Sequence, residues 1–177
     1  LVAQKLPGQK PTLVARHQEL LAMPGLDAVI IATPDFAHTG VLIDAVRAGK
    51  DAFVEKPLSA TLQDAVDALD AVEKTDRIVQ VGTQRRSSAR FLAAAEYVKS
   101  GALGPITKIE TAWNRNVPSW ARPVDGVRRA DVDWEHYQMA LPKREWDPVR
   151  FRCWHWYYEY TTGLVGLLGS HMIDVAL

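Results

Sequence analysis

The sequence has 177 residues, of which 47% are hydrophobic and 24% charged, as in ordinary globular proteins. Its 21 basic and 21 acidic residues balance and form no block of like charge, which argues against a nucleic-acid or anionic-membrane partner. The apolar runs are too short to span a bilayer. A single cysteine, Cys153, excludes an internal disulfide and a multi-cysteine zinc site.

The first 25 residues read as the end of a βα unit. Thr12–Ala15 is predicted to form a short strand and His17–Met23 a short helix, which Pro24-Gly25 ends.

Two short apolar runs then stop abruptly in polar residues and a proline. Ala28–Ala32 and Phe53–Val54 do not alternate with polar residues, which predicts strands buried on both faces of a parallel sheet. Between them, residues 36–48 carry apolar groups at near-helical spacing, and Gly49 follows where a helix would end. In such a βαβ unit the crossover is right-handed, so both strand ends lie at the carboxyl edge of the sheet, where open α/β sheets bind ligands.

The same alternation continues to residue 82. Thr61–Lys74 has a helical apolar stripe, and Thr61 with Asp64 resembles an N-terminal cap. Ile78–Val81 is a third candidate for a buried strand, and Gln84 follows its end. The β-α-β-α-β order predicts an α/β fold with a parallel sheet.

The pattern of alternating strands and helices ends after residue 82, and we predict two domains, residues 1–85 and 86–177. In the second, Phe91–Lys99 is a predicted helix, and Ile106–Trp113 partly alternates as a strand with one covered face would. A long aromatic-rich loop is expected at about 114–150. The spacing of Gly163, Gly166 and Gly169 does not match a nucleotide-binding fingerprint and indicates close packing instead. This part is predicted to be α+β.

Lys56 is the first candidate for chemistry, although a lone lysine in a turn is ordinarily a surface residue. Its unperturbed pKa of about 10.4 makes it a poor base. Burial beside another positive charge would lower that pKa, and Lys56 could then exchange a proton with a substrate hydroxyl. Glu55 could anchor the lysine or a cofactor. The ends of the other two strands, at Thr33-Pro34 and Gln84, are expected to converge with it.

Histidines supply the other candidates. His38 would line a pocket at the start of its helix, although lone histidines are more often structural. His171 and Asp174 are three residues apart and share one helical face, so they form either an exposed pair or an acid/base oriented by a carboxylate. A metal site with His155 lacks the usual ligand spacing, and we predict no metal.

These motifs resemble those of the family of glucose–fructose oxidoreductase, inositol dehydrogenase and the MocA proteins (Gfo/Idh/MocA). The matching motifs are Ala32-Thr-Pro-Asp-Phe-Ala-His38, Glu55-Lys-Pro57, Gly104-Pro105 and Gly169-Ser-His-Met-Ile-Asp174, in the order of the family. The resemblance implies a Rossmann domain that binds NAD or NADP, and a substrate and oligomerisation domain with a mostly antiparallel sheet. It also implies that the bond between Lys56 and Pro57 is cis.

The resemblance assigns roles to the candidate residues. Lys56 and His171 would be catalytic, and Lys56, His171 and Asp174 would contact the substrate. The cofactor-binding residues would be Thr33, Pro34, His38, Glu55, Lys56, Pro57 and Gln84.

Three departures from the family qualify this. The glycine-rich turn and the ribose-reading acid of the family would lie upstream of Leu1, and the second sheet would be cut short. We therefore expect a fragment with an incomplete Rossmann-type sheet, inactive alone, with weak cofactor affinity and marginal stability. The usual aspartate four residues before the histidine is replaced by Leu167, which cannot charge-pair His171.

The predicted function is an NAD(P)-dependent oxidoreductase that acts on a sugar, a polyol or a related hydroxyl compound. Two alternatives stay open: a glycoside hydrolase that oxidises its sugar transiently with NAD, and a non-catalytic sensor of cofactor or sugar. We expect a cytoplasmic homo-oligomer with a small-molecule substrate. The start at Leu1 leaves an exported form open.

Overall fold

The computed structural model describes residue 8, residues 10–113 and residues 122–177. A three-stranded parallel sheet, in the order β1-β2-β3, forms its centre. The strands are β1 (Ala28–Ile31), β2 (Asp51–Glu55) and β3 (Val79–Gly82). The register pairs Ala28 with Asp51 and Glu55 with Gly82, so the three carboxyl ends are aligned. The predicted α/β fold is confirmed.

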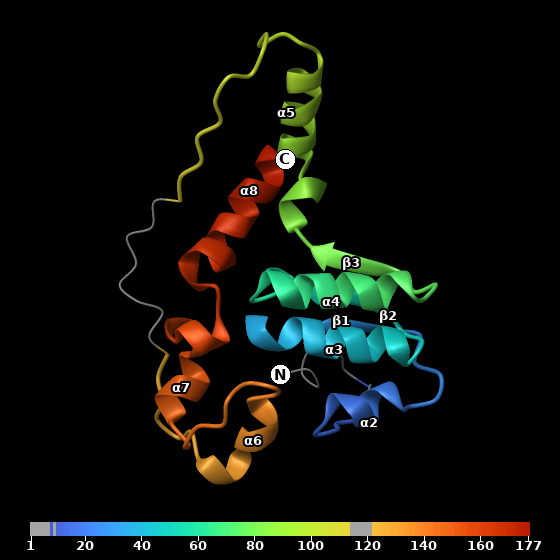
Figure 1. The fold of residues 1–177 in the computed structure, drawn as a ribbon, viewed down its shortest axis with the longest axis vertical. Coiled ribbons are helices and arrows are strands. Elements are labelled where there is room, and N and C mark those ends of the chain that lie inside the picture. Colours follow the sequence, from blue (N-terminus) through green and yellow to red (C-terminus); the bar gives the residue numbers. More distant parts are fainter. Residues whose placement is uncertain (1–7, 9, 114–121) are drawn as a thin grey trace.

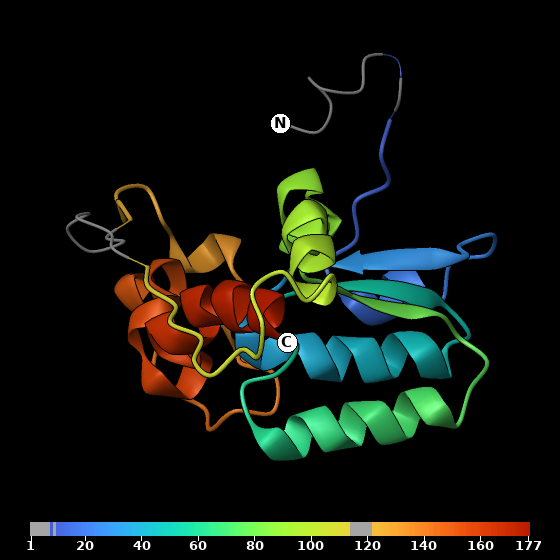
Figure 2. The ribbon, with the colours of Figure 1, turned by 90° about the horizontal axis from the view of Figure 1, so that it is seen from above.

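Two long helices cover one face of this sheet, namely α3 (Asp35–Arg47) and α4 (Leu62–Glu73). Figure 2 shows them side by side beneath the strands. The short α2 (His17–Leu21) lies against α3, and the hydroxyl oxygen of Thr61 caps α4 by accepting from the Asp64 N–H at 3.1 Å. The cap predicted at Thr61 is therefore confirmed.

The core lies between α3, α4 and the sheet. Its buried residues come from these elements and from α2: Leu21, Val29, Ile31, Val41, Leu42, Ala45, Val46, Ala52, Val54, Ala68 and Ala71. The opposite face of the sheet is different, since Ile30 is 78% exposed and β1 alternates between exposed and buried residues. The prediction of strands buried on both faces is therefore wrong for the described residues, because their helices cover only one face.

The rest of the chain is helical or irregular. It contains η1 (Gln84–Ser87), α5 (Ala89–Lys99), η2 (Arg129–Asp131), α6 (Trp134–Tyr137), α7 (Pro148–Arg152), η3 (Trp154–Trp156), η4 (Tyr158–Tyr160), the π-helix η5 (Val165–Gly169) and α8 (Ser170–Ala176). In Figure 1, α8 runs back to lie beside η1 and the start of α5. No helix within the described ranges is long and apolar enough to cross a membrane.

Two predicted strands are absent from the structure. Residues 12–15 and 106–113 are irregular, and Leu13 and Ile109 are exposed. A strand needs a hydrogen-bonded neighbour, and neither segment has one among the described residues. The described part of the predicted loop at 114–150 contains η2, α6 and the start of α7, while residues 114–121 lie outside the described part. The antiparallel sheet and the boundary between residues 85 and 86 stay predictions.

The packing of α3 provides a test of the core. Leu42 is 1% exposed, whereas Leu62 on α4 is 82% exposed. We expect Leu42→Ala to lower the free energy of unfolding by about 2–5 kcal/mol, because it leaves a cavity. Leu62→Ala should change it by less than about 1 kcal/mol. Urea denaturation of both variants measures this, and equal losses would contradict the packing described.

Candidate active site at the carboxyl edge of the sheet

The three parallel strands bring the predicted motifs to one edge. Thr33 and Pro34 follow β1, Glu55 ends β2 and is followed by Lys56-Pro57, and Gln84 begins η1 just after β3. Thr33 and Gln84 are exposed, while Pro34, Glu55, Lys56 and Pro57 are half-buried. The peptide bond between Lys56 and Pro57 is cis, as the resemblance implied. The edge is therefore open to a ligand and lined by the residues that the sequence indicated.

His38 connects two of these strand ends from below. Its ring is 1% exposed, its Nδ1 lies 2.7 Å from the Pro57 carbonyl oxygen, and its Nε2 lies 2.8 Å from that of Thr33. Carbonyl oxygens only accept, so each contact is a hydrogen bond when that nitrogen carries its hydrogen. A neutral ring carries one N–H and donates to one of the two carbonyls at a time, while its other nitrogen lies in contact with the second, so His38 lies between the turns after β1 and β2.

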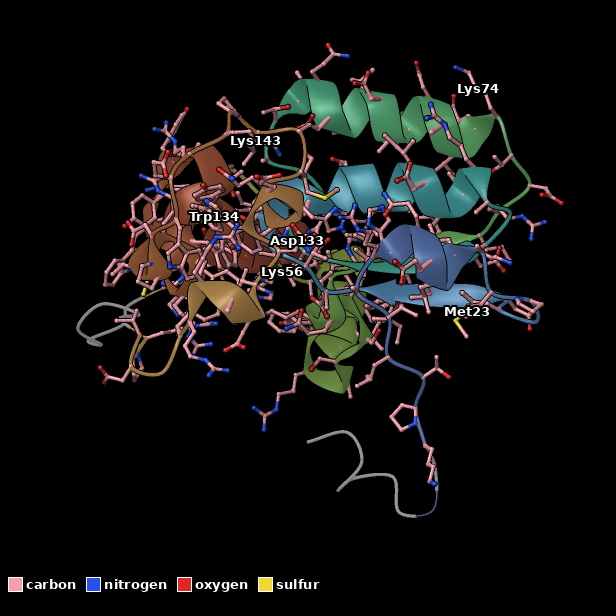
Figure 3. The ribbon with its side chains drawn as sticks, turned by 90° about the horizontal axis from the view of Figure 1, so that it is seen from below. Met23, Lys56, Lys74, Asp133, Trp134 and Lys143 are labelled. Atoms are coloured by element: carbon pink, nitrogen blue, oxygen red, sulfur yellow. The ribbon has the colours of Figure 1, made fainter. Side chains whose placement is uncertain are left out.

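Lys56 reaches across to the C-terminal part of the chain. Its Nζ donates a 2.8 Å hydrogen bond to the backbone carbonyl oxygen of Leu167 in the π-helix η5. Figure 3 shows Lys56 where the sheet meets the helices that follow residue 122. The Leu167 side chain is buried, so this position offers Lys56 a main-chain oxygen instead of a carboxylate.

His171, one helical turn after Leu167, lies in the electrostatic field of Lys56. Burial lowers the pKa of His171 below its usual 6.5, the positive charges of Lys56 and Arg85 lower this pKa further, and Glu55 and Asp174 oppose the shift. The ring is tilted against Trp113, with centroids 5.7 Å apart, and none of the described residues hydrogen-bonds it. The lowered pKa favours the neutral form of His171, in which one ring nitrogen can accept a proton.

Asp174 is engaged elsewhere. Its Oδ1 accepts a 2.6 Å charge-assisted hydrogen bond from Nε of Arg86, which belongs to η1 after β3. Its other carboxylate oxygen, Oδ2, is buried without a hydrogen-bond partner among the described residues. The structure thus brings Glu55, Lys56 and His171 together, while the Asp174 carboxylate bonds Arg86 rather than the His171 ring.

Sequence reasoning missed Arg85 and Arg86. Arg85 lies over the Trp113 ring at 4.8 Å and donates to the Met172 sulfur at 2.9 Å. Together the two arginines fix α8, and hence His171, beside the end of β3. The signal available in the sequence was the pair of basic residues that directly follows Gly82-Thr-Gln84.

Sequence reasoning also missed Asp35, which holds the segment before the π-helix. Its carboxylate is buried and accepts from the Thr161 hydroxyl at 2.9 Å and the Thr162 N–H at 3.4 Å. Burial raises the pKa of Asp35, and the hydrogen bonds from both threonines oppose that rise. A Cβ on Gly166 would lie 1.6 Å from the Thr162 hydroxyl oxygen, so only glycine fits there. The close packing predicted for these glycines is confirmed at Gly166.

The described ranges contain no group of three His, Cys, Asp or Glu residues placed to hold a metal ion.

The sequence of this chain is similar to those of known proteins. A family model described as "Oxidoreductase family, NAD-binding Rossmann fold" matches residues 4–83. The scyllo-inositol 2-dehydrogenase (NAD(+)) of Bacillus subtilis is 41% identical over 86 residues, which are 49% of this chain and 25% of that protein. The chain spans between 25% and 35% of the length of the curated relatives compared with it.

Two solved structures extend the comparison. The scyllo-inositol dehydrogenase of Lactobacillus casei with bound NAD(H) and scyllo-inositol has a TM-score of 0.51 and 26% identity, over 52% of this chain and 28% of that one. An NAD-binding protein from Listeria innocua is similar over 98% of this chain and 40% of its own, with a TM-score of 0.62 and 22% identity. The latter shows a shared fold that includes residues beyond the sheet.

The electrostatic coupling of Lys56 and His171 can be measured directly. In Lys56→Met, we expect the pKa of His171 to rise, because a positive charge that disfavours protonation is removed. It should stay below 6.5, because burial persists. The titration of the His171 ring protons by NMR measures this shift, with Lys74→Met, at the exposed end of α4, as the control. An unchanged or lowered pKa in Lys56→Met would contradict the described proximity.

Proposed function

We propose, since the chain belongs to the Gfo/Idh/MocA family of NAD-binding oxidoreductases, that the whole protein is an NAD(P)-dependent dehydrogenase. Its substrate would be a sugar, a polyol or a related hydroxyl compound. The observation that carries this proposal is the convergence of Lys56 and His171 at the carboxyl edge of the parallel sheet. Inositol dehydrogenases among the relatives act on compounds of this class.

The residues at this edge fit the nicotinamide end of NAD or NADP. None of the described residues donates a hydrogen bond to the Glu55 carboxylate, which is half-buried and can accept from the N–H groups of a carboxamide. The exposed Thr33 and Gln84 add polar groups, and Pro34 and Pro57 give the edge apolar, rigid walls. When bound, the nicotinamide supplies the acceptor or donor of hydride.

The protein side chains would then handle the proton. The lowered pKa of His171 favours its neutral ring, which can take the proton of a substrate hydroxyl. The Lys56 amine is held by one hydrogen bond to Leu167, which leaves its other N–H groups to orient the substrate oxygen. Arg86 and Asp174 would position His171 through α8.

A cofactor-binding sensor is the second candidate, and Leu167 favours it. The position next to Lys56 provides a neutral carbonyl instead of a carboxylate, so one charge expected in a dehydrogenase site is absent. NAD binding without turnover on a panel of polyols and sugars would point to this sensor. Release of free sugar from a glycoside without accumulation of NADH would point instead to the transient-oxidation hydrolase.

The assembly and location of the whole protein are also part of the proposal. We propose residues 86–177 as the start of a substrate and oligomerisation domain, in a cytoplasmic homo-oligomer. The exposed Leu164, Val165 and Ile173 around α8 are apolar groups that a larger domain or a second subunit would cover.

The catalytic role of Lys56 has a matched control in Lys74, an exposed lysine at the C-terminal end of α4 that Figure 3 shows far from Lys56. In the full-length protein, Lys56→Met should lower kcat for substrate-dependent NAD reduction by about 10²–10⁴-fold, because general acid–base catalysis contributes that much. Lys74→Met should retain the wild-type rate. Stopped-flow or steady-state absorbance at the NADH band measures both.

Retention of the wild-type rate by Lys56→Met would refute the assignment of Lys56. The affinity for NAD, measured by calorimetry on the same preparations, separates loss of chemistry from loss of cofactor binding.

A further inference from the structure

A cavity lies beside the strand edge, between the end of β1 and the segment that includes α7. Its volume is about 200 Å³, and it is lined by Pro34, Arg122, Tyr137, Phe151, Arg152 and Trp154. Two of the lining residues are therefore arginines and three are aromatic. This volume is below that of a typical whole-ligand pocket of roughly 300–1,000 Å³, so the cavity suits one functional group of a ligand.

Its two arginines differ from their neighbours in having no acidic partner. Arg128 pairs with Asp131, and Arg144 and Arg150 both pair with Glu159. Within the described ranges, neither Arg122 nor Arg152 forms an ion pair. Among the described residues, the Arg152 guanidinium donates one hydrogen bond, from Nε to the Pro123 carbonyl oxygen at 3.4 Å, and its terminal N–H groups have no acceptor there.

The chain brings these two arginines to one cavity. The backbone N–H of Arg122 contacts the buried Cys153 sulfur at 3.4 Å, next in sequence to Arg152. With the bond from Arg152 to Pro123, this fastens residues 122–123 against residues 152–153. A bound anion would balance the two positive charges at this cavity.

Tyr137 adds an independent observation. Its hydroxyl is buried and has no hydrogen-bond partner among the described residues, and the residue lines the cavity. Buried polar groups without a partner are rare in proteins and call for an explanation such as a ligand. Burial raises the pKa of Tyr137, so its hydroxyl keeps its hydrogen and can donate.

We propose that this cavity binds the anionic group, a carboxylate or a phosphate, of the substrate, an inference that rests on the proposed oxidoreductase function. Guanidinium groups bind both anions with two parallel hydrogen bonds. Pro34 belongs both to the cavity and to the strand edge, which puts the anion beside the site of Lys56 and His171. The substrate is accordingly a sugar acid or a sugar phosphate rather than a neutral polyol.

Equilibrium binding to the full-length protein tests this without requiring turnover. Calorimetry with NAD present would compare gluconate, glucose 6-phosphate and the neutral myo-inositol on the wild type, Arg122→Gln, Arg152→Gln and the control Arg90→Gln, an exposed arginine on α5. We expect at least one anionic probe to bind the wild type more tightly than myo-inositol. In Arg122→Gln and Arg152→Gln its affinity should fall roughly 10- to 100-fold, as for loss of a charge-assisted hydrogen bond, and in Arg90→Gln less than about twofold.

The identity of the tighter probe distinguishes a carboxylate substrate from a phosphate substrate. The affinity for NAD should be unchanged in every variant, which checks folding. A variant that fails to fold is replaced by a measurement on the wild type, in which inorganic phosphate should compete with the preferred anionic probe.

Tighter binding of myo-inositol than of either anion, or equal anion affinity in the wild type and in folded variants, would overturn the inference. Neither result depends on NAD reduction. The anion site can therefore fail while the dehydrogenase assignment stands, and the reverse also holds.

Discussion

The buried imidazole of His38 ties together the two loops on which the candidate site depends. Thr33-Pro34 and Lys56-Pro57 follow different strands. The pairing of β1 with β2 ends at Ile31 and Val54, so it does not fix the distance between these two loops. The contacts of the two His38 ring nitrogens with the Thr33 and Pro57 carbonyl oxygens fix that distance from beneath. Because His38 is fully buried in α3, the core that positions the helix also positions the site.

Two longer connections then join the sheet to the C-terminal segment. Asp35, at the start of α3, holds Thr161 and Thr162, and Lys56 holds the Leu167 carbonyl. Both attach to the same strand ends that His38 braces. The π-helix and α8 are consequently presented to the edge of the sheet, and His171 acquires its lowered pKa from burial there and from Lys56. The chemistry of His171 is thus a product of packing between segments more than 100 residues apart.

The sequence predicts the parts of this arrangement that depend on local chemistry. The β1-α3-β2-α4-β3 order, the Thr61 cap and the ends of α3 and α5 at glycines follow from periodicity and from residues that favour caps and turns. The convergence of Thr33, Lys56 and Gln84 also follows, because parallel strands with right-handed crossovers share one carboxyl edge.

The remaining features depend on distant partners. Residues 12–15 and 106–113 have strand-like composition but no neighbouring strand among the described residues, and composition alone does not form a sheet. The acceptor for Lys56 is a backbone carbonyl, which any residue at position 167 would carry, so no side-chain pattern could reveal it. Asp35 and Arg86 find their partners 126 and 88 residues away, beyond the reach of helical or strand periodicity.

A crystal structure of the full-length protein with NAD(H) bound tests the central claim most directly. The account predicts density for the nicotinamide end at the edge formed by Pro34, Glu55 and Lys56, with His38 still between the Thr33 and Pro57 carbonyls. Nicotinamide density away from these three strand ends, or a cofactor-bound state in which His171 is remote from Lys56, would contradict it.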